Sequence, residues 1–193
     1  MSLIPLGVLA ASGAAGPIGA YELIESVVLT GTQATIEFSN LNSTYGSTYK
    51  HLQVRWAART DRGLANDPLR YYYNGSQAAN TYADHSFFTN GTTSSTENTA
   101  NGSYITMHSG LPASSATANI FGIGYLDILE PFNTNRNKTS RGLHTGMADA
   151  TAYQIRSHSG LWMNTTAISS ITFDPIGSFV SGTRFSLYGM RSS

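Results

Sequence analysis

The chain has no cysteine among its 193 residues. This absence excludes disulfide bonds, thiolate metal sites and cysteine nucleophiles, and it leaves the redox compartment open. A chain of this length can bury a substantial hydrophobic core without covalent cross-links. We therefore expect side-chain packing and backbone pairing to stabilise the fold.

Charge is also scarce. Asp, Glu, Lys and Arg make up 11% of the residues, and 11 basic residues are matched by 11 acidic ones, for a formal net charge of zero. A typical soluble domain has about 25% charged residues. A nucleic-acid binder needs a basic surface that neutralises phosphates, so we expect no nucleic-acid partner. A neutral polar surface favours close association with other proteins, because little charge has to be desolvated.

Long helical patterns are missing too, and short alternating or β-branched segments separated by turn residues take their place. The clearest is Tyr49–Arg59, in which Leu52, Val54 and Trp56 alternate with polar residues. Successive side chains of a strand point to opposite faces, so this pattern predicts a central strand that buries these three residues. The whole series predicts an all-β fold, an antiparallel β-sandwich of the jelly-roll type formed by one domain over 21–193.

Two local patterns give further predictions. Tyr21–Thr30 and Gln33–Ser39 are alternating segments separated by Gly31 and Thr32, which predicts a hairpin. Asn90–Ser103 is polar and rich in turn residues, which predicts an exposed loop.

Residues 1–20 are small and apolar, and they are interrupted by proline and glycine. The segment is too short and too broken to cross a bilayer, and the first basic residue is Lys50, so an export signal would lack its positive region. We expect an extended N-terminal arm that packs against a neighbouring subunit. A frayed terminus and a signal-peptide core are the alternatives. The arm's candidate interface residues are Leu3, Ile4, Leu6, Val8, Leu9 and Ile18.

Further candidate binding residues lie in the body of the chain. Tyr72, Arg136 and Arg141 are candidates for a protein interface, because tyrosine rings bury large areas and arginines can pair with an acidic partner surface. Three nearby tyrosines, Tyr71, Tyr73 and Tyr82, are candidates for stacking on glycan rings, with a place in the core as the alternative.

Catalytic signatures are weak. No G-x-S-x-G motif occurs. The nearest carboxylate pair, Asp127 and Glu130, would point to opposite faces of a strand. The histidines are far apart in the sequence, without the spacing of metal ligands: His51, His85, His108, His144 and His158. We therefore expect no catalytic residues, no metal and no cofactor, and a protein that is not an enzyme.

Several segments carry a family resemblance. They are SGLWMN at Ser159–Asn164, GSFVSGTRFSLYGM at Gly177–Met190, PLGVLAASG at Pro5–Gly13 and NIFGIGYLDIL at Asn119–Leu129. Together they resemble a family of short structural proteins of tailed-phage virions.

The resemblance implies a protein that is made in the bacterial cytoplasm and displayed on the particle surface, without membrane insertion. The leading expectation is a capsid decoration (cement) protein, a homotrimer that binds the major capsid protein or other virion proteins and stabilises the shell. The second hypothesis is a receptor-binding module of a head or tail fibre that recognises host-surface glycans, and the third is a glycan-degrading enzyme.

Overall fold

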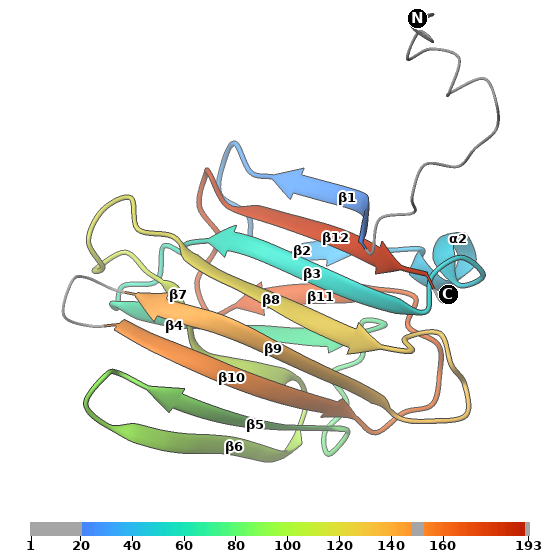
Figure 1. Cartoon of the computed structure of the whole chain (residues 1–193). Helices are drawn as coiled ribbons and strands as arrows, with labels where there is room; N and C mark the ends of the chain where they lie inside the picture. The colour runs from blue at the N-terminus through green and yellow to red at the C-terminus, as the bar shows by residue number, and fades with distance from the viewer. Residues whose placement is uncertain (1–20, 148–152, 192–193) are drawn as a thin grey trace, which may run out of the picture.

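The structure is a computed structural model that describes residues 21–147 and 153–191. Two antiparallel sheets pack face to face, which confirms the predicted all-β sandwich (Figure 1). The jelly-roll topology and the single domain over 21–193 stay predictions. The candidate interface residues of the N-terminal arm, namely Leu3, Ile4, Leu6, Val8, Leu9 and Ile18, lie outside the described residues.

Within residues 21–147 and 153–191, the larger sheet has eight strands. In spatial order they are β1 (Glu22–Val28), β12 (Arg184–Met190), β3 (His51–Ala58), β8 (Gly122–Leu129), β9 (Lys138–Met147), β10 (Tyr153–Trp162), β5 (Tyr82–Thr89) and β6 (Ser94–Gly102). In Figure 1 this sheet lies in front of the smaller one, so the viewer looks onto the face that the smaller sheet does not cover.

In the part of the chain that the structure describes, the smaller sheet has four strands. Their spatial order is β2 (Ile36–Phe38), β11 (Ile171–Pro175), β4 (Asn66–Tyr73) and β7 (Ile105–Pro112). The short helix α2 (Leu41–Tyr45) follows β2. The smaller sheet packs against one face of the larger sheet (Figure 1).

The core fills the space between the sheets. Leu52, Val54 and Trp56 of β3 are buried, as their alternation predicts. The rest of the core combines aliphatic side chains with many large aromatic ones: Phe38, Tyr71, Tyr73, Tyr82, Trp162, Phe173, Phe179 and Phe185. The large rings leave no room for side chains at some facing positions. A Cβ atom at Gly124 would collide with the indole ring of Trp56.

The predicted hairpin is wrong. β1 pairs with β12 in the larger sheet, whereas β2 pairs with β11 in the smaller sheet. The chain therefore crosses from one sheet to the other between the two strands. Alternation and a short connection fit both arrangements, because a crossover between packed sheets also needs only a turn.

The predicted loop at Asn90–Ser103 is also wrong in part, since Ser94–Gly102 forms the edge strand β6. Most residues of this strand are exposed on both faces, so no hydrophobic alternation marks it. The turn before it is held by Asn90, whose Oδ1 accepts hydrogen bonds from the backbone N–H groups of Thr92 and Thr93. Its strand structure comes from backbone pairing with β5.

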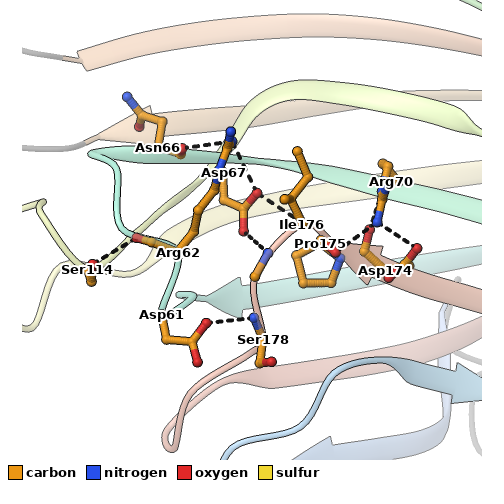
Figure 2. Close-up of polar contacts among 11 residues, drawn as sticks. Asp61, Arg62, Asn66, Asp67, Arg70, Ser114, Asp174, Pro175, Ile176 and Ser178 are labelled. Atoms are coloured by element: carbon orange, nitrogen blue, oxygen red, sulfur yellow. Dashed lines mark hydrogen bonds and ion pairs between the residues drawn. The ribbon is translucent and has the colours of Figure 1, made fainter.

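Carboxylates fix the connections at one end of the sandwich (Figure 2). Asp67 is fully buried and accepts the backbone N–H groups of Ile176 at 3.2 Å and Gly177 at 2.9 Å. Asp61 accepts the N–H of Ser178 at 2.7 Å. Arg70 donates to the Asp174 carboxylate and, at 3.0 Å, to the Pro175 carbonyl. These bonds tie the segment after β11 to β4 and to the β3–β4 connection.

Candidate binding face of the larger sheet

The outer face of the larger sheet, opposite the smaller sheet, carries most of the exposed apolar side chains of β5, β8, β9 and β10. Within the described residues nothing packs over this face. Its large apolar residues are each between 36% and 57% exposed: Phe87, Ile123, Tyr125, Leu129, Leu143 and Ile155. Monomeric proteins rarely leave neighbouring large apolar side chains uncovered, so this face is the first candidate for binding.

The strand register places these residues side by side. Tyr125 lies opposite Leu143, and the row continues through Ser157 to Phe87. Ile155 lies opposite Thr145, whose hydroxyl is 3.4 Å from the backbone nitrogen of Ile123. We call the group formed by Phe87, Ile123, Tyr125, Leu143 and Ile155 the apolar patch.

The patch borders a shallow hollow of about 380 Å³. Its lining comes from β3, β8 and β9 and consists of Gln53, Arg55, Ile123, Gly124, Tyr125, Leu143, His144 and Thr145. A hollow lined by apolar side chains with a few polar groups at its rim is suited to receiving a side chain of a protein partner.

A second row, adjacent to the patch, is polar. From β12 to β6, paired neighbours contribute Tyr188, Gln53, Asp127, Arg141, Ser159, His85 and Asn98, which we call the polar row. On the far side of this row the next positions are again largely apolar, with Leu129, Thr139, Leu161 and Ala83. The outer face thus alternates between apolar and polar bands that run across the strands.

The two halves of the polar row differ. In one half, Asp127 accepts a hydrogen bond from Gln53 Nε2 at 2.6 Å and lies 3.5 Å from Arg141 Nε, so its charge is compensated. In the other half, Ser159, His85 and Asn98 are exposed. This half borders a second hollow of about 480 Å³, lined by His85, Ser86, Phe87, Thr96, Glu97, Asn98, Arg141, Ser157, His158 and Ser159.

The inner face of the same sheet holds a buried histidine cluster. His144 Nε2 lies 3.3 Å from the backbone carbonyl of His108, which accepts only, so this nitrogen carries the proton. His158 Nε2 lies 3.2 Å from the Tyr71 hydroxyl, which is 2.7 Å from the hydroxyl of Ser140. Asp84 accepts the backbone N–H of Thr106 on the free edge of β7. The sequence positions of these residues gave no sign of this cluster.

Burial keeps the two inner histidines neutral. It lowers the pKa of His144 from 6.5 to about 4. The hydrogen bond to the His108 backbone opposes this shift, whereas the side-chain charges of Arg156 and His108 act in the same direction as burial. Burial and the neighbouring His144 lower the pKa of His158 from 6.5 to about 3. In the described parts of the chain, no three His, Asp or Glu side chains are arranged to hold a metal ion.

The structure corrects the prediction that three tyrosines are available to stack on glycan rings. Tyr71, Tyr73 and Tyr82 have no exposed surface, because β4 and β5 direct them into the core. The Tyr82 hydroxyl donates to the Ser76 carbonyl at 2.9 Å, and the Tyr73 ring lies 5.5 Å from that of Trp162. None of the three is accessible to a glycan ring.

The candidate interface residues lie apart. Tyr72 is half-buried on the other side of β4. Arg136 is exposed in the β8–β9 connection and forms an ion pair with Glu130 at 2.8 Å. Arg141 belongs to the polar row, and its side chain is 73% exposed. Of these three, only Arg141 lies on the outer face of the larger sheet.

The apolar patch was missed by the sequence predictions, although β8 carries a signal for it. In Gly122–Leu129, the outward Ile123, Tyr125 and Leu129 alternate with the inward Leu126 and Ile128, so both faces of the strand are apolar. A strand of a two-layer sandwich needs only one apolar face. The excess of apolar residues on β8 therefore indicates a second buried or binding face.

No helix in the described residues is both long and apolar enough to cross a membrane. No protein-family model and no curated protein matches the chain. Two solved structures of the alginate lyase Aly36B are similar, both double mutants, one in complex with an alginate tetrasaccharide and the other with a trisaccharide. The first has a TM-score of 0.30 at 10% identity, over 87% of this chain and 80% of that one. The second has a TM-score of 0.27 at 8% identity, over 86% of this chain and 80% of that one.

The expectation that the protein is not an enzyme is contradicted by this comparison, because both similar structures are lyases, and we do not retain it. At these TM-scores the likeness carries no argument about a reaction or a substrate. The resemblance to virion proteins stays a prediction.

Proposed function

We propose that this chain is a structural protein of a tailed-phage particle, attached to neighbouring particle proteins by the outer face of its larger sheet. The preferred position is the capsid surface, where the major capsid protein is the main partner. A homotrimer displayed in this way would repeat the same contact many times over the shell.

The apolar patch is the observation that carries this proposal. Its five side chains lie on four neighbouring strands, in rows that also contain Thr145 and Ser157, and the hollow beside them is suited to an inserted side chain. Covering such a surface contributes about 25 cal/mol for each Å² of apolar area removed from water. The low charge of the chain and the resemblance to virion proteins agree with a surface built for protein contacts.

The proposal is tested with purified particles of the phage that carries the chain. Ile123→Asp places a charge in the middle of the apolar patch, where docking would have to desolvate it. We expect this variant to be depleted at least tenfold from particles assembled in its presence, as measured by quantitative gel electrophoresis.

Ile176→Asp is the matched control. Ile176 is 53% exposed and Ile123 is 57% exposed, but Ile176 lies after β11, away from the outer face. The control variant should be incorporated normally. Equal incorporation of both variants would rule out the patch as the attachment surface.

A second candidate function is a receptor-binding module of a head or tail fibre. The exposed half of the polar row, with its own hollow, favours it. Copy number separates the two candidates. Hundreds of copies over the head support decoration, whereas a few copies confined to the tail or to fibres support receptor binding.

A further inference from the structure

The polar row has a geometry that a protein-attachment surface does not require. Each of seven adjacent strands, from β12 to β6, contributes one outward polar side chain to a single line. Neighbouring strands are about 4.8 Å apart, so the line extends for about 29 Å across the sheet. Polar side chains therefore recur once per strand along this track. Gln53 and Asp127 are nearly buried and bonded to each other, so the exposed donors and acceptors lie at Ser159, His85 and Asn98.

We propose that this track binds a neutral polysaccharide chain lying across the strands. The inference deepens the second candidate function, receptor binding, and rests on it. It is separate from the proposed attachment function, because it uses a different row of residues. The part of the polysaccharide that makes most contacts would lie over the hollow of about 480 Å³ at β10, β5 and β6.

The residue types in the row match a hydroxyl-rich ligand. Serine hydroxyls both donate and accept hydrogen bonds, Asn98 offers an amide that does both, and the two imidazole nitrogens of His85 are further hydrogen-bonding positions. These three residue types are exposed on β10, β6 and β5. A sugar, whose hydroxyls also donate and accept, can satisfy all of them.

The flanking apolar bands add the second element of carbohydrate recognition. Phe87, Tyr125 and Leu143 border the row on one side, and Leu129 and Leu161 border it on the other. Sugar rings present apolar C–H faces, which pack on aromatic and aliphatic side chains while their hydroxyls bond to polar groups. A polar line between two apolar bands matches this amphipathic ligand.

Charge argues against two other polymers. The formal charges on the row are Arg141 and Asp127, which lie 3.5 Å apart and compensate each other. A nucleic acid would require a net basic track. An extended peptide presents its bonding groups along its backbone and is bound at the edge of a sheet, whereas this row lies on a face.

The test uses the intact protein and sensors coated with dextran, laminarin or xylan, with double-stranded DNA as a charged comparator, read by biolayer interferometry. We expect binding to at least one of the three neutral polysaccharides and none to DNA. Ser159→Arg, which places a bulky side chain in the middle of the exposed half, should weaken that binding at least tenfold. His85→Ala should weaken it more moderately.

Ser95→Arg is the matched control. Ser95 is exposed and pairs with Phe88, on the face of β6 opposite to the polar row. This variant should bind as the unmodified protein does, and circular dichroism should show the same fold for all variants. The inference is overturned if none of the three polysaccharides binds, if DNA binds more tightly than they do, or if Ser159→Arg has no effect.

This result is independent of attachment to particles. Ile123 lies two positions along β8 from Tyr125, which borders the polar row. Ile123→Asp should therefore change polysaccharide affinity by less than about twofold, while it reduces incorporation into particles. A protein that is incorporated normally but binds no polysaccharide therefore refutes the polysaccharide site alone.

Discussion

The two faces of the larger sheet are built from alternate residues of the same strands, yet their polar side chains differ in exposure and in hydrogen bonding. On β10, the inward Arg156 is 2% exposed. It donates to Glu97 at 2.8 Å and to Gln154 at 2.7 Å, and it lies over the ring of Phe88. The outward Ser157 and Ser159 of the same strand are exposed. The inner face bonds its polar groups within the fold, whereas these two serines of the outer face stay exposed to solvent.

The largest difference between the faces should appear at adjacent residues of β10. A Cβ atom at Gly160 would lie 2.6 Å from the Tyr71 hydroxyl and 2.8 Å from the Ile105 side chain. We expect Gly160→Val to lower the free energy of unfolding by about 3 kcal/mol, because overpacking displaces core side chains. Ser159→Val, one residue away on the outer face, should change it by less than about 0.5 kcal/mol. Urea unfolding measures both, and equal losses would remove the distinction between the faces.

A second difference should appear between two basic residues of β9. The Lys138 ammonium group is buried and donates to the carbonyls of Asn133, Arg136 and Thr165 at 2.7 to 2.9 Å. Lys138→Met leaves these carbonyls without their shared donor and should cost about 2 kcal/mol. Arg141→Met, on the outer face, should be nearly neutral. Thermal and urea unfolding compare the two variants. A large loss of unfolding free energy in Arg141→Met would show that Arg141 on the outer face stabilises the fold.

The histidine cluster makes stability depend on pH. The folded-state pKa values of His144 and His158, about 4 and about 3, lie below their ordinary value of 6.5. The unfolded chain therefore binds more protons in this range, and stability is complete above pH 6.5 and falls as the pH drops towards 4. Lowering the pH from 7 to 6 should cost about 1.4 kcal/mol for the pair.

Variants separate this effect from general acid unfolding. His144→Gln and His158→Gln should each reduce the dependence of unfolding free energy on pH between 7 and 5. His85→Gln, on the outer face, should leave it unchanged. A slope that is insensitive to both inner substitutions would show that the cluster is not the source of the acid sensitivity.

A small change in stability is expected at the apolar patch itself. Ile123→Asp replaces a side chain that is 57% exposed, so its cost should stay below about 1 kcal/mol, within the range of strand propensities. Differential scanning calorimetry checks this against Ile176→Asp. A large loss at Ile123 alone would mean that its loss of particle binding has a folding cause.

Much of the fold could be predicted from the sequence because alternation records burial directly. Leu52, Val54 and Trp56 were assigned to the core from their spacing, and they are buried. Pairing was harder to predict, because alternation does not identify a strand's neighbour: β1 and β2 belong to different sheets. β6 was missed because an exposed edge strand needs no apolar face.

The candidate site was the part that sequence reasoning could not assemble. The polar row joins Gln53, Asp127 and Asn98 through strand register, and register is set by the packing of the whole sheet. The tyrosines of β4 were ambiguous for a related reason. A strand in a four-stranded layer alternates in the same way whichever face is buried, so only the position of the second sheet shows that Tyr71 and Tyr73 lie inside.

A cryo-electron microscopy map of the particle tests the central claim most directly, because it shows which face of the sandwich contacts a neighbour. The account predicts that the outer face of the larger sheet, at Ile123, Tyr125 and Leu143, lies against another particle protein. A map in which this face is turned to solvent, and the smaller sheet makes the contact, would contradict it.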